Sequence, residues 1–430
     1  MDLFSIFLCF LELLSLVEFD KLELPKEGTR IKLENGKLLV PDDPIIPFIE
    51  GDGIGREVIN IARRVLDAGV KKAYGGTHQI TWLETYAGGK AKEIYDKILP
   101  DDTISAIDHF IVGLKGPVRT PVGGGYRSVN VQLRQSLDLY ANIRPIFHIE
   151  GVPTPILHPE TVDLVIFREN TEDLYGGLEW PAESEPAKQI SDFLYQQLKV
   201  ETRVDAGLGL KVISQYGTKR IMRKAIQYAL THDRKRITLV HKGNIMKFTE
   251  GAFREWGYEV AKEEFGDITI TEKELEEKYN GTLPAGKIIV NDRITDAMFQ
   301  EILLRPGDYD ILVAPNLTGD YMSDAAAALI GGLGVAPGVN MGDHIAVFEA
   351  IHGTAPDIAG KNIANPSSAI LSGILMLEYL GWQEAANVVF RAMRKTIQSG
   401  QVTADLARLL KGVSPISTTE FAELLIKNIS

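Results

Sequence analysis

Short apolar runs recur along the chain, and most are followed by a stretch in which apolar residues return every three or four positions. A short continuous apolar run is typical of a buried strand, and the longer spacing is typical of an amphipathic helix. Predicted strands cover residues 44–50, 79–85, 110–116, 161–167, 236–241, 287–291, 309–315 and 345–353. Predicted helices follow the turn at 51–55 and cover roughly 101–109, 217–232, 246–264, 293–304 and 320–330. Alternating strands and helices predict an α/β fold with a largely parallel sheet.

The helix after residue 55 has the clearest apolar face. Val58, Ala62, Val65, Leu66 and Gly69 share one side of it, and a Gly-Gly pair at 75–76 ends it. The last hundred or so residues are mostly helical after the strand at 345–353. Residues 173–214 have few strand signals and are rich in charge and proline near 180–186, so we expect them to leave the sheet.

Two glycine clusters raise the question of dinucleotide binding. "GDGIG" at 51–55 is one residue short of the G-x-G-x-x-G spacing, and "GLGVAPG" at 332–338 has proline where a glycine is needed. We therefore expect tight strand-to-helix turns, and a fold that is not of the Rossmann type.

Composition narrows the classes of function. The 430 residues suggest two or more domains, and 45% apolar content allows ample cores. A net charge of −12 disfavours nucleic acid as a partner, although an acidic protein can carry a basic pocket for small anions. The single cysteine, Cys9, permits no intrachain disulfide and favours a reducing, cytoplasmic location. The apolar residues 1–19 lack a basic start and a cleavage site and are short for a membrane span, so we favour a terminal extension or an upstream start codon.

Two aspartates four residues apart, Asp320 and Asp324, are the strongest candidates for metal ligands. On a helix this spacing places both carboxylates on one side, where they repel each other unless a cation lies between them. Oxygen ligands without histidine or cysteine favour Mg²⁺ or Mn²⁺. A helix cap remains the alternative for Asp320.

Basic residues are candidates for binding carboxylates. Ser128, Asn130 and Arg134 fall within two turns of a predicted helix, and Arg144 and Arg168 each follow a strand-like run. Arginines at strand ends can form bidentate pairs with carboxylates, although separate surface arginines are the simpler interpretation of each one alone. Lys242 ends an apolar strand and is either an acid-base group or a surface lysine.

Together, long segments of the chain from about Leu39 onward resemble the isocitrate/isopropylmalate dehydrogenase family, most closely its isocitrate-specific branch. The segments are "LKGPVRTPVGGGYRSVNVQLRQSLDLYANIRP", "VIFRENTEDLYGGLEW", "LVHKGNIMKFTEGAFREWGYEVA", "NLTGDYMSDAAAALIGGLGVAPG" and "HGTAPDIAGKNIANPSS". The resemblance implies a large cofactor-binding domain (1–139 and 331–430), a small domain (140–172 and 215–330) and a dimerisation clasp (173–214).

The resemblance also implies a reaction and the residues that perform it. The reaction is the oxidative decarboxylation of isocitrate to 2-oxoglutarate and CO₂. Ser128 and Asn130 match residues that bind the distal carboxylate of the substrate. Three arginines, Arg134, Arg144 and Arg168, match residues that together bind the substrate's carboxylates. Tyr175 matches the tyrosine that protonates the enol.

Two further residues are expected to act across a subunit boundary. Lys242 matches a lysine that handles the hydroxyl proton, and Asp292 matches a third metal ligand beside Asp320 and Asp324. The family supplies both from the partner subunit, which implies an obligate homodimer with shared active sites.

The resemblance places the cofactor on the "HGTAP" turn at 352–356. Members that use NADP typically follow this turn with lysine and tyrosine, where this chain has Asp357 and Ile358. A carboxylate suits ribose hydroxyls and repels a 2′-phosphate, so we expect a preference for NAD over NADP, although Arg408 points the other way. The expected cofactor-binding residues are Arg119, Thr120, His352, Gly353, Thr354, Ala355, Pro356, Asp357, Ile358, Asn365, Ala404, Asp405 and Arg408.

Three alternatives remain open at this point. The enzyme could prefer NADP, or it could act on homoisocitrate or 3-isopropylmalate. A non-catalytic regulatory subunit is the alternative outside the enzymes, but it would typically lack Lys242, Tyr175 and the aspartates.

Overall fold

The structure is a computed structural model that describes residues 18–120 and 128–429. The expectation for the N-terminal extension, and with it Cys9, lies almost wholly outside the described residues. In the described ranges no helix is both long and apolar enough to cross a membrane.

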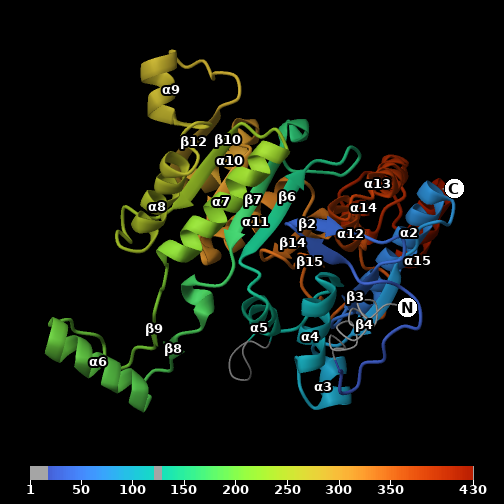
Figure 1. Ribbon diagram of the computed structural model, residues 1–430, viewed down its shortest axis with the longest axis horizontal. Helices are drawn as coiled ribbons and strands as arrows, with labels where there is room; N and C mark the ends of the chain where they lie inside the picture. The colour runs from blue at the N-terminus through green and yellow to red at the C-terminus, as the bar shows by residue number, and fades with distance from the viewer. Residues whose placement is uncertain (1–17, 121–127, 430) are drawn as a thin grey trace, which may run out of the picture.

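A sheet of eleven strands runs through the body of the protein (Figure 1). In spatial order its strands are β11 (Thr269–Thr271), β12 (Ile288–Ile294), β10 (Arg236–His241), β13 (Ile311–Ala314), β7 (Asp163–Glu169), β6 (Ala141–Phe147), β14 (Pro337–Met341), β15 (Ala346–Ala350), β5 (Val112–Lys115), β3 (Ile45–Ile49) and β4 (Thr81–Thr85).

The middle of the sheet differs from the largely parallel sheet that was predicted. β6 and β14 run antiparallel to each other and to their outer neighbours, whereas the remaining pairs are parallel. β14 was not predicted, because its start at Pro337 and Gly338 has the composition of a turn. Proline is compatible with the first residue of a strand, where its missing N–H is least needed.

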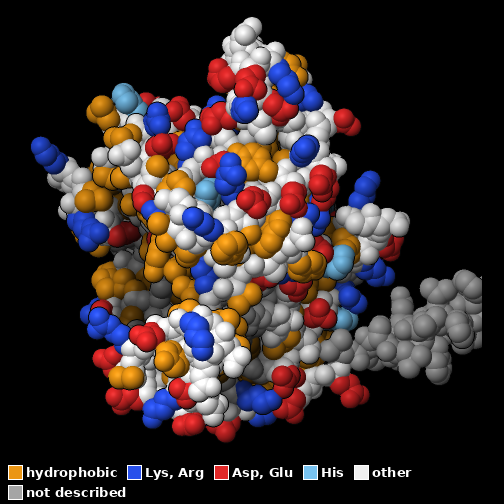
Figure 2. All heavy atoms as spheres, turned by 90° about the vertical axis from the view of Figure 1, so that its left-hand side faces the viewer, with side chains coloured by type: hydrophobic (Ala, Val, Ile, Leu, Met, Phe, Trp, Pro, Cys, Tyr) orange, Lys and Arg blue, Asp and Glu red, His pale blue; other side chains and the backbone are white. Residues whose placement is uncertain are grey.

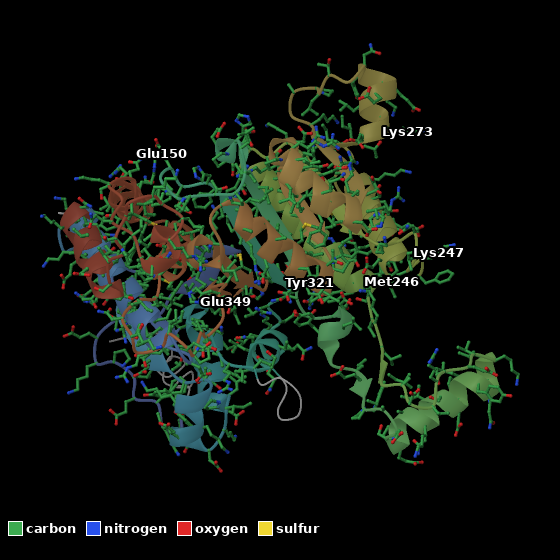
Figure 3. All side chains as sticks on the ribbon, turned by 180° about the vertical axis from the view of Figure 1, so that it is seen from behind. Glu150, Met246, Lys247, Lys273, Tyr321 and Glu349 are labelled. Atoms are coloured by element: carbon green, nitrogen blue, oxygen red, sulfur yellow. The ribbon has the colours of Figure 1, made fainter. Side chains whose placement is uncertain are left out.

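Helices cover both faces of the sheet. α7 (Gln215–Thr231) and α8 (Glu250–Glu263) lie in front of its β10 half, and α10 (Thr295–Leu304) and α11 (Asn316–Leu329) lie behind it (Figures 1 and 3). At the other half α2 (Gly55–Tyr74) packs with α12, α13 and α15. The other α-helices are α3 (Gly89–Tyr95), α4 (Asp101–Phe110), α5 (Val129–Ser136), α6 (Glu185–Leu198), α9 (Glu272–Tyr279), α12 (Ser367–Tyr379), α13 (Gln383–Gln398), α14 (Ala404–Ala407) and α15 (Thr418–Ile429).

α2 shows why the apolar pattern predicts the fold well. Its face of Val58, Ala62, Val65 and Leu66 is fully buried, and the helix ends where Gly75 adopts a positive φ of 62°. Burying each of the larger side chains contributes about 1.5–3 kcal/mol, which fixes the orientation of the helix.

Residues 173–214 leave the body as an arm (Figure 1). Its stalk is the antiparallel pair of β8 (Glu179–Trp180) and β9 (Leu208–Gly209), and α6 lies at its end. Among the large apolar side chains of α6, Phe193, Tyr195 and Leu198 are all exposed. Hydrophobic side chains are also visible on the face of the body seen in Figure 2. A small hairpin, β1 (Lys32–Glu34) with β2 (Lys37–Leu39), precedes the sheet.

Candidate active site

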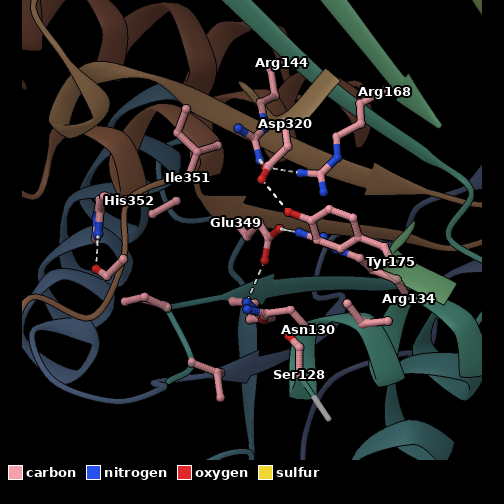
Figure 4. Close-up of a pocket in the computed structure, with 16 residues that line it drawn as sticks. Ser128, Asn130, Arg134, Arg144, Arg168, Tyr175, Asp320, Glu349, Ile351 and His352 are labelled. Carbon is pink, nitrogen blue, oxygen red and sulfur yellow. Dashed lines mark hydrogen bonds and ion pairs between the residues drawn. The ribbon is translucent and has the colours of Figure 1, made fainter. Parts of the chain in front are cut away.

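A polar cavity of about 210 Å³ lies between the two halves of the molecule (Figure 4). It brings together side chains from α5, the central strands, the turn that carries Tyr175, and α11. Seven of the residues predicted to be catalytic, to bind substrate or to bind metal line it: Ser128, Asn130, Arg134, Arg144, Arg168, Tyr175 and Asp320.

Helix α5 presents the first group of these residues. Ser128 immediately precedes the helix, and its hydroxyl accepts a hydrogen bond from Thr120 at 3.0 Å. Asn130 and Arg134 are one turn apart and therefore lie on the same side of the helix. The amide oxygen of Asn130 is buried and has no hydrogen-bond partner among the described residues. A buried polar atom of this kind at a cavity wall is what a bound ligand would satisfy.

Arg144 and Arg168 reach the cavity from the neighbouring strands β6 and β7. Arg168 donates to the carboxylate of Asp320, and Arg144 donates to that of Asp324 at 2.9 Å. Burial and the nearby charge of Arg134 lower the pKa of Arg168 to about 10. Buried guanidinium groups that repel one another are stabilised by a bound anion. The cavity is therefore suited to a negatively charged ligand.

An ion cluster at the floor of the cavity was missed by the sequence analysis. Glu349 of β15 accepts hydrogen bonds from Lys115 at 2.5 Å, Arg134 at 2.8 Å and Asn340 at 2.7 Å. Burial opposes the charge on this carboxylate, but Lys115 and Arg134 outweigh it and lower the pKa of Glu349 below its ordinary range. We call Lys115, Arg134 and Glu349 the inner cluster; it fixes the Arg134 guanidinium at the cavity wall. Lys115 ends an apolar strand, as Arg168 nearly does, and this was the available signal.

Helix α11 carries the two candidate metal ligands. The helix begins at Asn316, so Asp320 lies in its second turn and is not a cap. The Tyr175 hydroxyl donates to the Asp320 carboxylate at 2.5 Å. Burial and the neighbouring charge of Asp320 raise the pKa of Asp324, even though Arg144 opposes the shift. The raised pKa of Asp324 reflects burial and repulsion between the two carboxylates, and a hard divalent cation bound between them would relieve that repulsion.

Lys242 and Asp292 do not reach this cavity. Asp292 lines a separate cavity, where it accepts a hydrogen bond from the Tyr258 hydroxyl at 2.7 Å and pairs with Arg254 at 2.9 Å. Lys242, after β10, pairs with Asp296. Within the described residues, no three acidic, histidine or cysteine side chains are arranged to hold a metal ion.

A second cavity of about 370 Å³ adjoins the first, and His352 lines both. The His352 Nε2 atom is buried and has no hydrogen-bond partner among the described residues, so it too can bind a ligand. Five more of the expected cofactor residues line the second cavity: Ile358, Asn365, Ala404, Asp405 and Arg408.

The remaining expected cofactor residues lie on neighbouring loops. Gly353 lines the first cavity, and the Thr354 carbonyl accepts a hydrogen bond from the Ile54 N–H at 2.9 Å. Ala355, Pro356 and Asp357 are exposed and line neither cavity, and Arg119 and Thr120 are exposed on the loop after β5.

Comparison with known proteins identifies the family. The model of the family described as "Isocitrate/isopropylmalate dehydrogenase" matches residues 45–425. The chain belongs to the isocitrate/isopropylmalate dehydrogenase family. The fold prediction, an α/β architecture of this family and not a Rossmann fold, is thereby confirmed.

The similar proteins are consistent with one another. The chain is 56% identical to a protein of Archaeoglobus fulgidus named "Isocitrate dehydrogenase [NADP]", over 96% of this chain and 99% of that protein. It is 50% identical, with the same coverage, to a protein of the same name from Haloferax volcanii. The crystal structure of isocitrate dehydrogenase from Methylococcus capsulatus is similar with a TM-score of 0.75 and 40% identity, covering 90% of this chain and 99% of that one.

These relatives overturn one expectation. The prediction that this family member prefers NAD is wrong, because its similar curated relatives are named for NADP. The structure supplies a physical reason. Asp357, on which the prediction rested, is exposed to water and does not line the second cavity, whereas Arg408 does. Both carboxylate oxygens of the nearby Asp405 already accept hydrogen bonds, from Asn365 and Thr403.

Proposed function

We propose that this protein oxidises isocitrate to 2-oxoglutarate and CO₂, with NADP as hydride acceptor and Mg²⁺ or Mn²⁺ as cofactor. The observation that carries the proposal is the composition of the first cavity. Four cationic and two anionic side chains line it, although the whole chain has a net charge of −12. A cationic cavity in an acidic protein is suited to a small polyanion such as a tricarboxylate.

The three arginines are suited to orienting that substrate. Arg134, Arg144 and Arg168 are buried and held by Glu349, Asp324 and Asp320, so their guanidinium groups are ordered before a ligand arrives. Guanidinium groups that are already held in place can bind carboxylates bidentately with little loss of side-chain entropy. Ser128, just before α5, and Asn130, one turn before Arg134 on α5, are suited to the distal carboxylate. An alkyl group such as that of 3-isopropylmalate would leave these polar groups unpaired, which favours isocitrate.

Proton transfer is assigned to Tyr175 and Lys242. Burial and the hydrogen bond to Asp320 raise the pKa of Tyr175 to about 12 despite the nearby Arg168, so its hydroxyl keeps a proton to give at neutral pH. Lys242 lies outside this cavity, and we assign it to the site of a partner subunit, where it removes the proton of the substrate hydroxyl.

The chemistry of the residues present supports a divalent cation and NADP as cofactors. Asp320 and Asp324, with Asp292 of a second copy, would hold the divalent cation. A bound cation of this type acidifies the substrate hydroxyl and stabilises negative charge on the adjacent oxygen. The second cavity would hold NADP, with Arg408 facing the 2′-phosphate and His352 at the junction with the substrate cavity.

The assembly that this mechanism needs is a homodimer. The exposed apolar side chains of α6 and the outward positions of Lys242 and Asp292 support a second copy packed against the arm. We propose that the arm, residues 173–214, is the dimerisation clasp, and that the large and small domains have the boundaries expected from the sequence. Cytoplasmic location remains part of the proposal.

A direct assay tests the function. The purified chain, with NADP and Mg²⁺, should reduce NADP when isocitrate is added, and it should release one CO₂ per NADPH. Homoisocitrate and 3-isopropylmalate should give lower kcat/KM values. Turnover that is faster with 3-isopropylmalate, or a purified chain with no turnover, would contradict the proposal.

A further inference from the structure

A second buried ion cluster lies at the base of the arm, outside the three cavities described above. The ammonium group of Lys211 contacts Asp173 at 2.6 Å and Glu250 at 2.9 Å. The side chains of Asp173 and Glu250 are 1% and 2% exposed, and that of Lys211 is 16% exposed. Burial lowers the pKa of Lys211, but its hydrogen bonds with the two carboxylates outweigh burial and raise it. We call these three residues the arm-base cluster.

Asp173 connects this cluster to Tyr175. It is the first residue of the 3-10 turn Asp173–Gly176 that carries Tyr175, and its own backbone has a positive φ of 65°. Its carboxylate accepts the N–H of Leu174 at 2.8 Å and the N–H of Leu317 at 3.1 Å. Leu317 lies in the first turn of α11, the helix of Asp320 and Asp324. Asp173 therefore sets the position of the Tyr175 turn relative to that helix.

Glu250 connects the same cluster to Lys242. It is the first residue of α8, and its carboxylate accepts the backbone N–H of Lys242. This hydrogen bond closes the loop between β10 and α8. Lys211 thus bridges two carboxylates, one of which holds the backbone beside Tyr175 and the other the backbone of Lys242.

We propose that Lys211 is a positioning residue for both proton-transferring groups. This inference rests on the proposed function. Without its ammonium group, two buried carboxylates would repel each other across a shared site, and the two backbone segments they hold would shift. Under the proposed dimer, Tyr175 serves the site of its own chain and Lys242 that of the partner. One lysine therefore sets geometry in both active sites.

The arm adds a link to assembly. Lys211 lies two residues after β9, and the next residue, Val212, accepts the N–H of Asp173 at 2.7 Å, so the cluster lies where the two ends of the arm meet. A partner that orders the arm would also order Lys211.

Two partial reactions of the full-length enzyme separate the effects. Reduction of oxalosuccinate by NADPH depends on Lys242, and exchange of the C3 hydrogen of 2-oxoglutarate with deuterated solvent depends on Tyr175. We expect Lys211→Met to slow both by about 10- to 100-fold, because small displacements of catalytic groups have effects of this size. The KM for isocitrate should change less than about twofold, since the arginine clamp is untouched. Lys211→Arg should restore part of both rates.

A matched control and two variants, each altering only one of the two carboxylates that Lys211 contacts, complete the test. Lys219 pairs with Glu259 and its side chain is 18% exposed, so Lys219→Met removes a lysine of similar burial and should leave both rates unchanged. Asp173→Asn should slow mainly the deuterium exchange, and Glu250→Gln mainly the reduction. If Lys211→Met does not fold, these two variants still test the proposal.

Several results would overturn it. A Lys211→Met enzyme that melts earlier but keeps both partial rates would show a purely structural lysine, and so would Asp173→Asn and Glu250→Gln variants that affect both rates equally. Failure of the proposed function is distinguishable, because the unmodified enzyme would then catalyse neither partial reaction.

Discussion

The inner cluster and two other residues, Lys242 and Asp292, are assigned to the proposed site in different ways. In the inner cluster, the side chains of Lys115 and Glu349 are 3% and 7% exposed, and their partners belong to the same chain (Figure 3 shows Glu349 near the centre of the molecule). Lys242 and Asp292 are 28% and 23% exposed, and they lie away from the cavity. In the proposed site, folding of one chain therefore positions the residues assigned to substrate binding, whereas Lys242 and Asp292 of the same chain are assigned to the site of a partner.

Mixed dimers test this contrast with the largest expected effect. Tyr175→Phe and Lys242→Met homodimers should each lose about 10²- to 10⁴-fold in kcat, as expected for the loss of a proton-transferring group. In a mixed dimer of the two variants, one site regains an intact Tyr175 and an intact Lys242 from opposite chains. Mixing the two inactive proteins under conditions of subunit exchange should therefore restore activity, measured as NADPH formation.

The control for this experiment is a chain that carries both substitutions. Mixed with either single variant, it cannot form a complete shared site, and it should restore nothing. If the two single variants also fail to complement each other while mixed dimers demonstrably form, Tyr175 and Lys242 serve the same chain's site and the contrast is lost.

Glu349→Gln tests the inner cluster itself. Removing one partner of a buried ion pair leaves Lys115 uncompensated, and we expect the free energy of unfolding to fall by about 3–5 kcal/mol. The KM for isocitrate should rise, because Arg134 loses its anchor. Urea denaturation measures the first effect and steady-state kinetics the second. Glu84→Gln breaks the more exposed pair with Lys90 and should cost under about 1 kcal/mol; equal losses for the two variants would contradict the distinction.

The pattern of apolar residues predicted most helices and strands, but not the strand pairings and ion pairs between residues far apart in the sequence. Helix α2 follows from five positions on one face, and strands such as β10 follow from continuous apolar runs. β14 was missed because Pro337 and Gly338 have turn composition, and its pairing with β6 and β15 is decided by tertiary contacts. The pairing of Lys115 with Glu349 joins residues 234 positions apart, and no local pattern reports it.

The candidate site shows the same limit. Nine of the residues proposed from the sequence line the first cavity. They could be proposed because the resemblance to the family covered them position by position. For Asp357 the residue type was visible in the sequence, but the direction it faces was not, and that direction decides whether a carboxylate acts on the cofactor. The roles of the individual residues stay predictions until the variants are measured.

Metal binding gives a second test of whether residues of two chains share one site, with a smaller expected effect than the mixed dimers. A ligand that binds only the folded state at a concentration 100 times its Kd adds about 2.7 kcal/mol to the free energy of unfolding. We expect Mn²⁺ to stabilise the dimer in this way. Asp320→Asn should abolish the stabilisation, and so should Asp292→Asn, although Asp292 lies in another cavity of the same chain. Thermal unfolding with and without Mn²⁺ measures it, and EDTA should remove activity.

The matched control for metal binding is Asp96→Asn, which alters an exposed aspartate paired with Lys92. Its response to Mn²⁺ should equal that of the unmodified protein. If Asp292→Asn retains the full response, the cation is bound by one chain alone and Asp292 has no part in binding it.

The smallest expected effect concerns the cofactor cavity, where Arg408 and Asp357 provide a comparison between a group that faces the ligand and one that faces water. Arg408 lines the cavity and has no ion-pair partner among the described residues, whereas Asp357 is exposed outside it. Arg408→Met should raise the KM for NADP about 10-fold, because a hydrogen bond to a charged group contributes about 1.5–3 kcal/mol. Asp357→Asn should change that KM less than about twofold. The kcat values of both variants should stay close to that of the unmodified enzyme, since neither residue lines the substrate cavity. A larger effect of Asp357→Asn than of Arg408→Met would mean that the loop turns toward the cofactor when it binds, and the assignment of Arg408 to the 2′-phosphate would then be wrong.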